Sequence, residues 1–283
     1  MSAETLDLPE PDRLEGAPHP RHTARLFGQE AAERAFLAAH GSGRLHHGWL
    51  LTGPRGVGKA TLAWRIARFL LTQPPDAPPG LFGAPERPGS LDIDPGHPVA
   101  RRVAALSEPG LFLLRRGPNE RGNALSDAIR VEEVRKLKSF LALSNAEGGP
   151  RVVIVDAADE LNVNAANAVL KLLEEPPARA TLLLVSHQPA RLLPTIRSRC
   201  RSLPLAPLSP ADLSAALAQA GVEAEDAKAL AALSGGSVGA AVALAEGGGA
   251  QLYADLVALL STLPRLDRAA AFFDRIDVIP AAR

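Results

Sequence analysis

The sequence is poor in cysteine and aromatic residues and has no excess of either charge. It contains one cysteine, one tyrosine and two tryptophans in 283 residues. A single cysteine excludes an internal disulfide framework and a zinc site built from several cysteines, and it fits a reducing, cytoplasmic setting. Lys+Arg and Asp+Glu both number 31. Strong binding to DNA or to an anionic membrane by this chain alone is therefore disfavoured, because both usually need a basic excess.

Long apolar runs and targeting signals are also lacking. No uninterrupted apolar run is long enough to span a bilayer. The acidic, polar start MSAETLDLPEPDRLEG fits neither a signal peptide nor a transit peptide. Residues 1–21 combine low hydrophobicity with several prolines, and this composition predicts a disordered N-terminal arm.

Residues 22–203 alternate between short apolar strands and amphipathic helices. We expect strands at 48–52, 110–114, 151–155 and 181–186. We expect helices at 60–71, 130–144 and 164–175, the last one capped by Asn164, and within 23–40 a helix that is preceded by a turn at residues 27–29. This alternation is typical of an α/β fold in which helices sandwich a parallel sheet. Beyond residue 203 the Ala/Leu-rich sequence predicts only helices, in a small lid (207–247) and a short C-terminal segment (248–283).

A glycine-rich loop with the pattern G-x-x-x-x-G-K lies between a predicted strand and a predicted helix, and its defining residues are Gly53, Gly56, Gly58 and Lys59. Such glycines let backbone N–H groups turn toward a phosphate, and the lysine reaches the β/γ oxygens. The alternative is a glycine-rich turn without a ligand. Ala60 replaces the Ser/Thr that ligates Mg²⁺, and Thr61 lies about 100° further round the helix. The loop therefore predicts ATP binding with poor positioning of Mg²⁺.

A second acidic position follows the apolar strand RVVIV. Asp156 ends this strand as in a Walker B motif, but the next residue is Ala157 rather than a glutamate that polarises water. Asp159 and Glu160 fall outside that position. The alternative is that Asp156 only caps the following segment. Because both Ala60 and Ala157 lack the expected functional group, we do not expect this chain to hydrolyse ATP by itself.

Three segments carry a resemblance to a known family: LFGQ at residues 26–29, NAANAVLKLLEEPP at 164–177 and LLPTIRSRC at 192–200. With the phosphate loop, they resemble the clamp-loader AAA+ family over about residues 22–247. The resemblance implies an accessory subunit of DNA polymerase III, a nucleotidyltransferase holoenzyme. It would belong to a five-membered ring that places the sliding clamp on primed DNA. The implied partners are the tau/gamma motor subunits and the delta subunit.

The resemblance also gives Arg199 a role. In the family, the Ser-Arg-Cys motif supplies an arginine finger in trans to the ATP site of a neighbouring tau/gamma subunit. The alternative is that Arg197, Arg199 and Arg201 form one solvated face of an extended segment. Cys200 is expected to be a small structural residue. The first sensor position would be Ser186 or His187, and no arginine occurs near residues 236–240, where a second sensor is expected.

The sequence departs from the family in two further places. Residues 73–98 contain no cysteine, so we expect a solvated loop rather than the zinc module of some family members. The residues after 248 are too few for the helical collar domain of the family and predict a truncated remnant. Two other functions remain open: an autonomous P-loop ATPase, and a P-loop kinase. A kinase would need an arginine-rich lid, which the Arg-poor segment after 203 does not offer.

Overall fold

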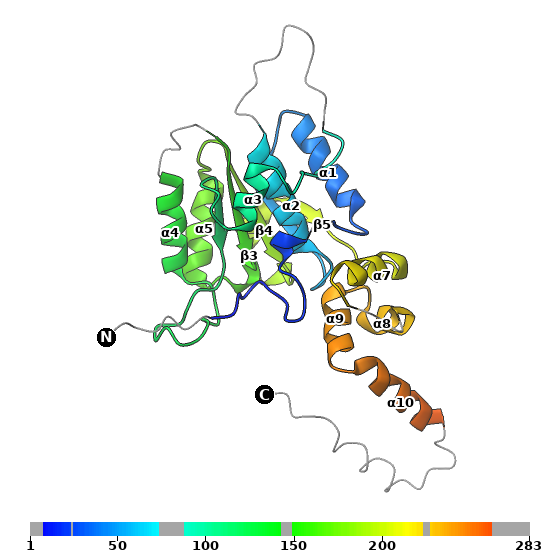
Figure 1. Cartoon of the computed structure of the whole chain (residues 1–283). Coiled ribbons are helices and arrows are strands. Elements are labelled where there is room, and N and C mark those ends of the chain that lie inside the picture. The colour runs from blue at the N-terminus through cyan, green and yellow to red at the C-terminus, as the bar shows by residue number, and fades with distance from the viewer. Residues whose placement is uncertain (1–7, 24, 74–87, 143–148, 223–226, 262–283) are drawn as a thin grey trace.

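A five-stranded parallel sheet forms the centre of the computed structural model, which describes residues 8–23, 25–73, 88–142, 149–222 and 227–261 (Figure 1). The spatial order is β2-β3-β4-β1-β5. The strands are β1 (Gly48–Thr52), β2 (Leu111–Leu114), β3 (Arg151–Asp156), β4 (Ala180–Ser186) and β5 (Arg201–Pro204). Trp49 of β1 stands opposite Leu183 of β4 and Arg201 of β5. The parallel sheet predicted from the apolar strands is confirmed.

Helices cover both faces of the sheet. They are α1 (Glu30–Gly41), α2 (Lys59–Thr72), α3 (Pro98–Ala104), α4 (Val131–Ala142), α5 (Val163–Glu174) and α6 (Pro194–Ser198), with short 3-10 helices η1 (Pro20–His22), η2 (Ala158–Glu160) and η3 (Pro189–Arg191). Successive residues of β3 enter different cores: Ile154 packs in the cluster that includes α2, and Val155 packs in the cluster of α4 and α5. This alternation explains why the strands are apolar on both faces.

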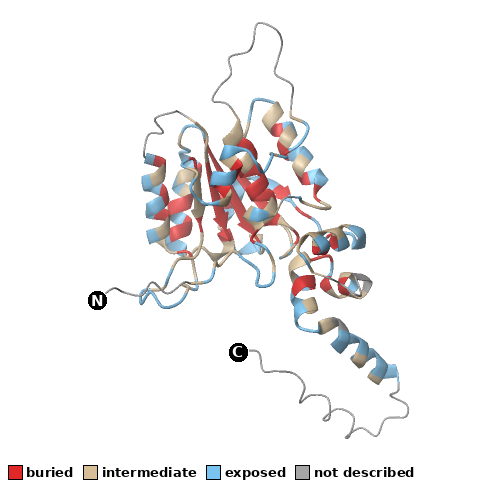
Figure 2. Cartoon of the chain, viewed as in Figure 1, coloured by how far each residue is buried: buried red, intermediate tan, exposed pale blue. Residues whose placement is uncertain are grey.

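The described residues after the sheet form the helices α7 (Pro210–Gln219), α8 (Ala227–Ser234), α9 (Val238–Glu246) and α10 (Gly249–Ser261). Leu213, Leu230 and Val242 are buried and belong to the same core cluster as α2, so the lid packs directly on the sheet domain. In contrast, most of the large apolar residues of α10 are exposed (Figure 2). Residues 262–283, the rest of the predicted collar remnant, lie outside the described residues.

Most predicted elements occur with shifted ends. The helix expected after a turn at residues 27–29 begins at Glu30, and Gly28 within that turn has a φ of +68°. The N-cap of α5 is Asn162, whose side chain accepts a hydrogen bond from the N–H of Ala165 at 2.8 Å. The prediction of Asn164 as the cap was wrong by two residues. Strand β5 and helix α3 were not predicted.

The prediction of a disordered arm over residues 1–21 was wrong for residues 8–21. His19 is 2% exposed and its ring packs edge-on against Trp64, with ring centroids 5.8 Å apart. The Nε2 atom of His19 lies 3.1 Å from Asp12 Oδ2, and Arg115 also pairs with Asp12. Few of the arm's own residues are apolar, so its order comes from ion pairs and from the surface of the folded domain, which composition does not reveal.

Candidate nucleotide pocket and exposed arginine

The glycine-rich loop connects the end of β1 to the start of α2. Gly58 is the N-cap of α2 and has a φ of +97°, and Gly56 has a φ of +77°. These conformations favour glycine because a Cβ atom would be strained there. The strand–loop–helix context expected of a phosphate loop is therefore present.

Lys59, the first residue of α2, is only 2% exposed. Its amino group donates a hydrogen bond to the carbonyl oxygen of Gly53 at 2.8 Å and another to the carbonyl of Pro54. Burial lowers the pKa of Lys59 to about 8, and the nearby carboxylate of Asp156 opposes this shift. The lysine is thus bonded to its own loop.

Asp156 lies at the carboxyl end of β3, beside the same cavity as Lys59. Burial raises its pKa to about 7, with further contributions from the charges of Asp12 and Glu160, while Lys59 acts in the opposite direction. The next residue is Ala157, which offers no functional group. A buried carboxyl with such a pKa is partly protonated at neutral pH.

Asp159, Ser186 and His187 lie at the carboxyl ends of β3 and β4. Asp159 Oδ1 accepts a hydrogen bond from the backbone N–H of His187 at 2.9 Å. Burial and then the charge of Lys59 lower the pKa of His187 to about 4, so the imidazole is neutral at pH 7. Ser186 is fully buried, and its Oγ has no hydrogen-bond partner within the described chain. Of the two sensor candidates, His187 lines the cavity.

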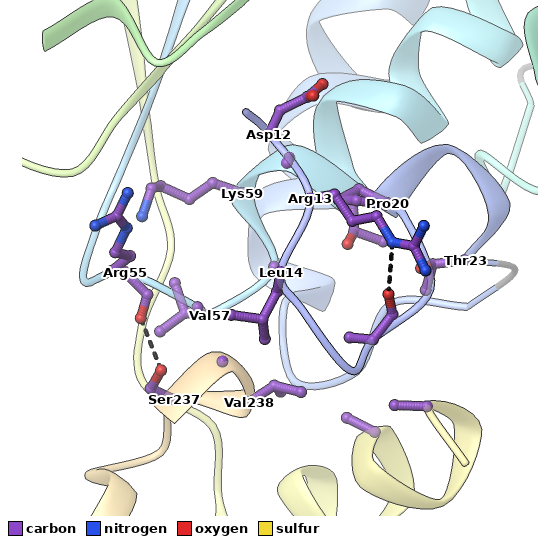
Figure 3. Close-up of a pocket in the computed structure, with 18 of the residues that line it drawn as sticks. Asp12, Arg13, Leu14, Pro20, Thr23, Arg55, Val57, Lys59, Ser237 and Val238 are labelled. Carbon is purple, nitrogen blue, oxygen red and sulfur yellow. Dashed lines mark hydrogen bonds between the residues drawn. The ribbon is translucent and has the colours of Figure 1, made fainter. Parts of the chain in front are cut away.

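The cavity has a volume of about 940 Å³ and lies between the arm, the loop and the lid (Figure 3). The lid is bonded to the loop: Ser237 Oγ donates to the carbonyl oxygen of Arg55 at 2.8 Å, and the N–H of Val238 donates to that of Gly56 at 2.9 Å. Thr61 lines the cavity together with Ala60. Of the predicted pocket residues, Gly56, Gly58, Lys59, Thr61 and Asp156 line this one cavity, whereas Gly53 does not.

Sequence reasoning missed the wall that the arm contributes to this cavity. Asp12, Leu14 and Thr23 line it, and Figure 3 shows Leu14 between the loop and the lid. The alternating charges of the arm were the available signal: Asp12 pairs with Arg115, and Glu10 pairs with Arg21. Only the fold reveals these partners, because Arg115 follows β2, about a hundred residues away.

Arg199 does not line this cavity. It is the C-cap of α6, and its neighbour Cys200 precedes β5, whose first residues pair with the beginning of β1. The phosphate loop follows the other end of β1. Arg199 therefore lies at the opposite end of β1 from the nucleotide pocket of its own chain.

The guanidinium of Arg199 is on the surface, with 38% of the side chain exposed. Its Nη2 atom lies 3.0 Å from Glu174 Oε1, and its Nη1 atom donates to the carbonyl of Thr195 at 3.2 Å. Arg197 is within α6, whereas the guanidinium carbon of Arg201 lies 5.2 Å from the ring centroid of Trp49. The three arginines thus do not form one extended face, and that alternative was wrong.

Cys200 is half-buried and packs against the core cluster of α4 and α5. Burial raises the pKa of its thiol to about 12. The thiolate is the reactive form of cysteine, so this environment disfavours nucleophilic chemistry at neutral pH and is consistent with a packing role.

Comparison with known proteins identifies the family. The sequence profile described as "DNA polymerase III, delta subunit" matches residues 28–209. The chain is also 42% and 36% identical to two curated delta′ subunits. It belongs to the DNA polymerase III delta′ family of clamp-loader proteins. The match includes both the phosphate loop and the segment with Arg199, so the delta′ family covers both parts of the site described above.

Three curated relatives extend this finding. The chain is 42% identical to the delta′ subunit of Pseudomonas aeruginosa over 195 residues, covering 68% of this chain and 53% of the relative. It is 36% identical to delta′ of Escherichia coli K12 over 215 residues, covering 75% and 58%. Identity to the gamma/tau subunit of Mycobacterium tuberculosis H37Rv is 32% over 219 residues, covering 74% and 33%. The chain thus spans about half the length of the delta′ relatives.

Solved structures match this chain at lower similarity. The RuvB Holliday junction branch migration motor of Thermotoga maritima is 19% identical, with a TM-score of 0.46, covering 78% of this chain and 61% of RuvB. Within the part of the delta′-family chain that the structure describes, no helix is long and apolar enough to cross a membrane. Its described residues also contain no group of three or more His, Cys, Asp or Glu side chains arranged to hold a metal ion.

Proposed function

We propose that this chain is a stator subunit of a DNA polymerase III clamp loader and supplies Arg199 to the ATP site of a neighbouring gamma/tau subunit. The observation that carries the proposal is the place of Arg199. It lies on the surface, away from the pocket of its own chain, within the segment that matches the delta′ family. A second subunit can reach the guanidinium there without unfolding this one.

The chemistry of phosphoryl transfer gives this arginine its role. Negative charge spreads over the transferred phosphoryl group in the transition state, and a planar guanidinium with several N–H donors stabilises it. Arginine fingers in well-studied phosphate hydrolases contribute roughly 10³–10⁵ in rate. In the proposed ring, hydrolysis at the gamma/tau subunit therefore depends on a residue from this chain.

The pocket of this chain is proposed to be inactive in hydrolysis. The amino group of Lys59 is bonded to two carbonyls of its own loop, and Ala60 offers no hydroxyl to Mg²⁺. The residue after Asp156 is an alanine, and α9 carries no arginine. These residues fit poorly to a catalytically active Mg·ATP. We propose that any ATP held in this cavity is not turned over.

The proposal includes partners and location. The other subunits would be gamma/tau and delta, with the sliding clamp and primed DNA reached through the assembled ring. The zero net charge of this chain supports this arrangement, because DNA affinity then comes from the assembly rather than from this subunit. Such a role belongs to the cytoplasm of a bacterial cell.

The test is Arg199→Ala in a loader reconstituted from this chain, gamma/tau, delta and the sliding clamp. We expect DNA-stimulated ATP hydrolysis to fall at least tenfold, because the neighbouring site loses its guanidinium. Arg197→Ala is the matched control, since Arg197 is exposed on the same helix, and it should keep near wild-type turnover.

An ATPase assay of the isolated chain separates the proposal from an autonomous ATPase. The isolated chain should show background hydrolysis, and Lys59→Ala should not change it. Hydrolysis by the isolated chain that Lys59→Ala abolishes would establish the autonomous ATPase instead. Unchanged turnover of the reconstituted Arg199→Ala loader would refute the finger.

A further inference from the structure

Two helix ends meet where Arg199 is held. Glu174 is the last residue of α5, and Arg199 caps the end of α6. Their side chains form an ion pair with Nη2 and Oε1 3.0 Å apart, although 25 positions separate them in the sequence. The carbonyl of Thr195 accepts a second hydrogen bond from the same guanidinium at 3.2 Å. The arginine is therefore fixed by two different elements.

Gly48 allows these helix ends to approach each other. A Cβ atom on Gly48 would lie 2.8 Å from Leu173 Cδ2 and 3.3 Å from the carbonyl oxygen of Arg199. His47 Nε2 lies 2.9 Å from the carbonyl oxygen of Leu173, which ties the end of α5 to the start of β1. The backbone under the ion pair is thus anchored to the start of β1.

The side chains above this anchored backbone are accessible. The exposed fractions are 38% for Arg199 and 40% for Glu174. An ion pair this exposed adds little to stability, about 0–1 kcal/mol. Its larger effect is on orientation, because a guanidinium has a rigid planar set of five N–H donors. Among the described residues, Glu174 and Thr195 each accept from one of these donors, which leaves others for an anion.

We propose that Glu174 is the positioning residue of Arg199. Its carboxylate holds the guanidinium so that the free N–H donors face the phosphate of a nucleotide bound by the neighbouring subunit. This inference rests on the proposed function in trans and extends it to a second residue. It predicts that loss of Glu174 lowers turnover at the neighbouring site without changing nucleotide affinity there.

The test compares Glu174→Ala, Glu174→Gln and Glu175→Ala in the reconstituted loader. Glu175 is the matched control: it is the adjacent glutamate, it is exposed, and within the described chain it forms no ion pair. We expect Glu174→Ala to lower kcat of DNA-stimulated ATP hydrolysis 3- to 10-fold with an unchanged KM for ATP. Glu174→Gln keeps an oxygen acceptor and should stay within twofold of wild type, like Glu175→Ala.

A double variant distinguishes positioning from a general structural effect. If Glu174 acts only through Arg199, Glu174→Ala lowers kcat no further in the Arg199→Ala background. A further fall in that background, or wild-type kcat for Glu174→Ala alone, would overturn the inference while the Arg199→Ala result still supports the finger. If Arg199→Ala itself has no effect, the proposed function fails instead, and with it the positioning role.

Discussion

At the scale of single residues, the cavity beside the glycine-rich loop contains two buried ionisable side chains, Lys59 and Asp156. Lys59 and Asp156 both have shifted pKa values because they are buried. In an active P-loop enzyme, phosphate and a metal ion would compensate such charges. Here Lys59 is bonded to carbonyls of its own loop, and Asp156 has a pKa near 7. The site therefore carries an electrostatic cost to the folded protein.

The pH dependence of stability tests this cost at Asp156. Its pKa is about 7 in the folded chain against about 3.9 in an unfolded one. Between these values the folded state binds more protons, so the free energy of unfolding falls as pH rises. Relative to Asp156→Asn, the wild type should lose on the order of 3 kcal/mol between pH 4.5 and 7.

Urea unfolding of both proteins across this pH range measures the difference. Asp127→Asn is the control, since Asp127 is exposed, and it should follow the wild-type pH dependence. Parallel curves for the wild type and Asp156→Asn would show that Asp156 is ionised in the folded chain.

At the scale of elements, helix α5 connects the acidic end of the sheet to the arginine. It begins after Asn162, which follows η2, and it ends at Glu174 beside Arg199. The helix is fixed at its start by a side-chain cap and along its length by Val169 and Leu173, which are buried against the sheet. Substitutions in the first turn of α5 should therefore lower the free energy of unfolding and have little effect on the orientation of Arg199 at the other end of the helix.

The cap of α5 gives a matched pair of variants. Asn162→Ala removes the hydrogen bond to the N–H of Ala165 and should lower the free energy of unfolding by about 1 kcal/mol. Asn164→Ala changes an exposed residue within the helix and should be nearly neutral or slightly stabilising, because alanine has a higher helix propensity. Thermal unfolding of both variants decides between the caps, and a larger loss for Asn164→Ala would contradict the structure.

At the scale of the whole molecule, the N-terminal arm packs on the sheet domain and forms one wall of the cavity. The carboxylate of Asp12 is 1% exposed and pairs with both His19 and Arg115. Glu10 pairs with Arg21 and Arg115. A buried carboxylate that loses its cationic partner is strongly unfavourable, so these pairs hold the arm over the cavity.

Arg115→Met tests the arm. It leaves the buried Asp12 without its guanidinium and should lower the free energy of unfolding by about 3 kcal/mol. It should also change the fluorescence of Trp64, which contacts His19. Arg101→Met is the control, because Arg101 is exposed on α3 and forms no ion pair within the described residues. Equal stability losses for the two variants would show that the arm is not held by Arg115.

The sequence by itself determined the parts of this protein that depend on local pattern. Strand β1 was predicted at its observed ends, and the loop before Lys59 was predicted from its glycines, because strand burial and positive φ angles select particular residues at fixed spacing. The parallel sheet followed from strands that are apolar on both faces. The family was also readable, since its motifs are continuous segments.

Only the tertiary structure decided which distant residues meet. Asp12 of the arm forms an ion pair with Arg115, which follows β2. Helix α5 brings Glu174 to the end of α6, where it forms an ion pair with Arg199. Strand β5 is a short segment of mixed polarity that forms because it pairs with the edge of β1. Such contacts depend on surfaces that form only after the chain has folded, and no local period or spacing in the sequence encodes them.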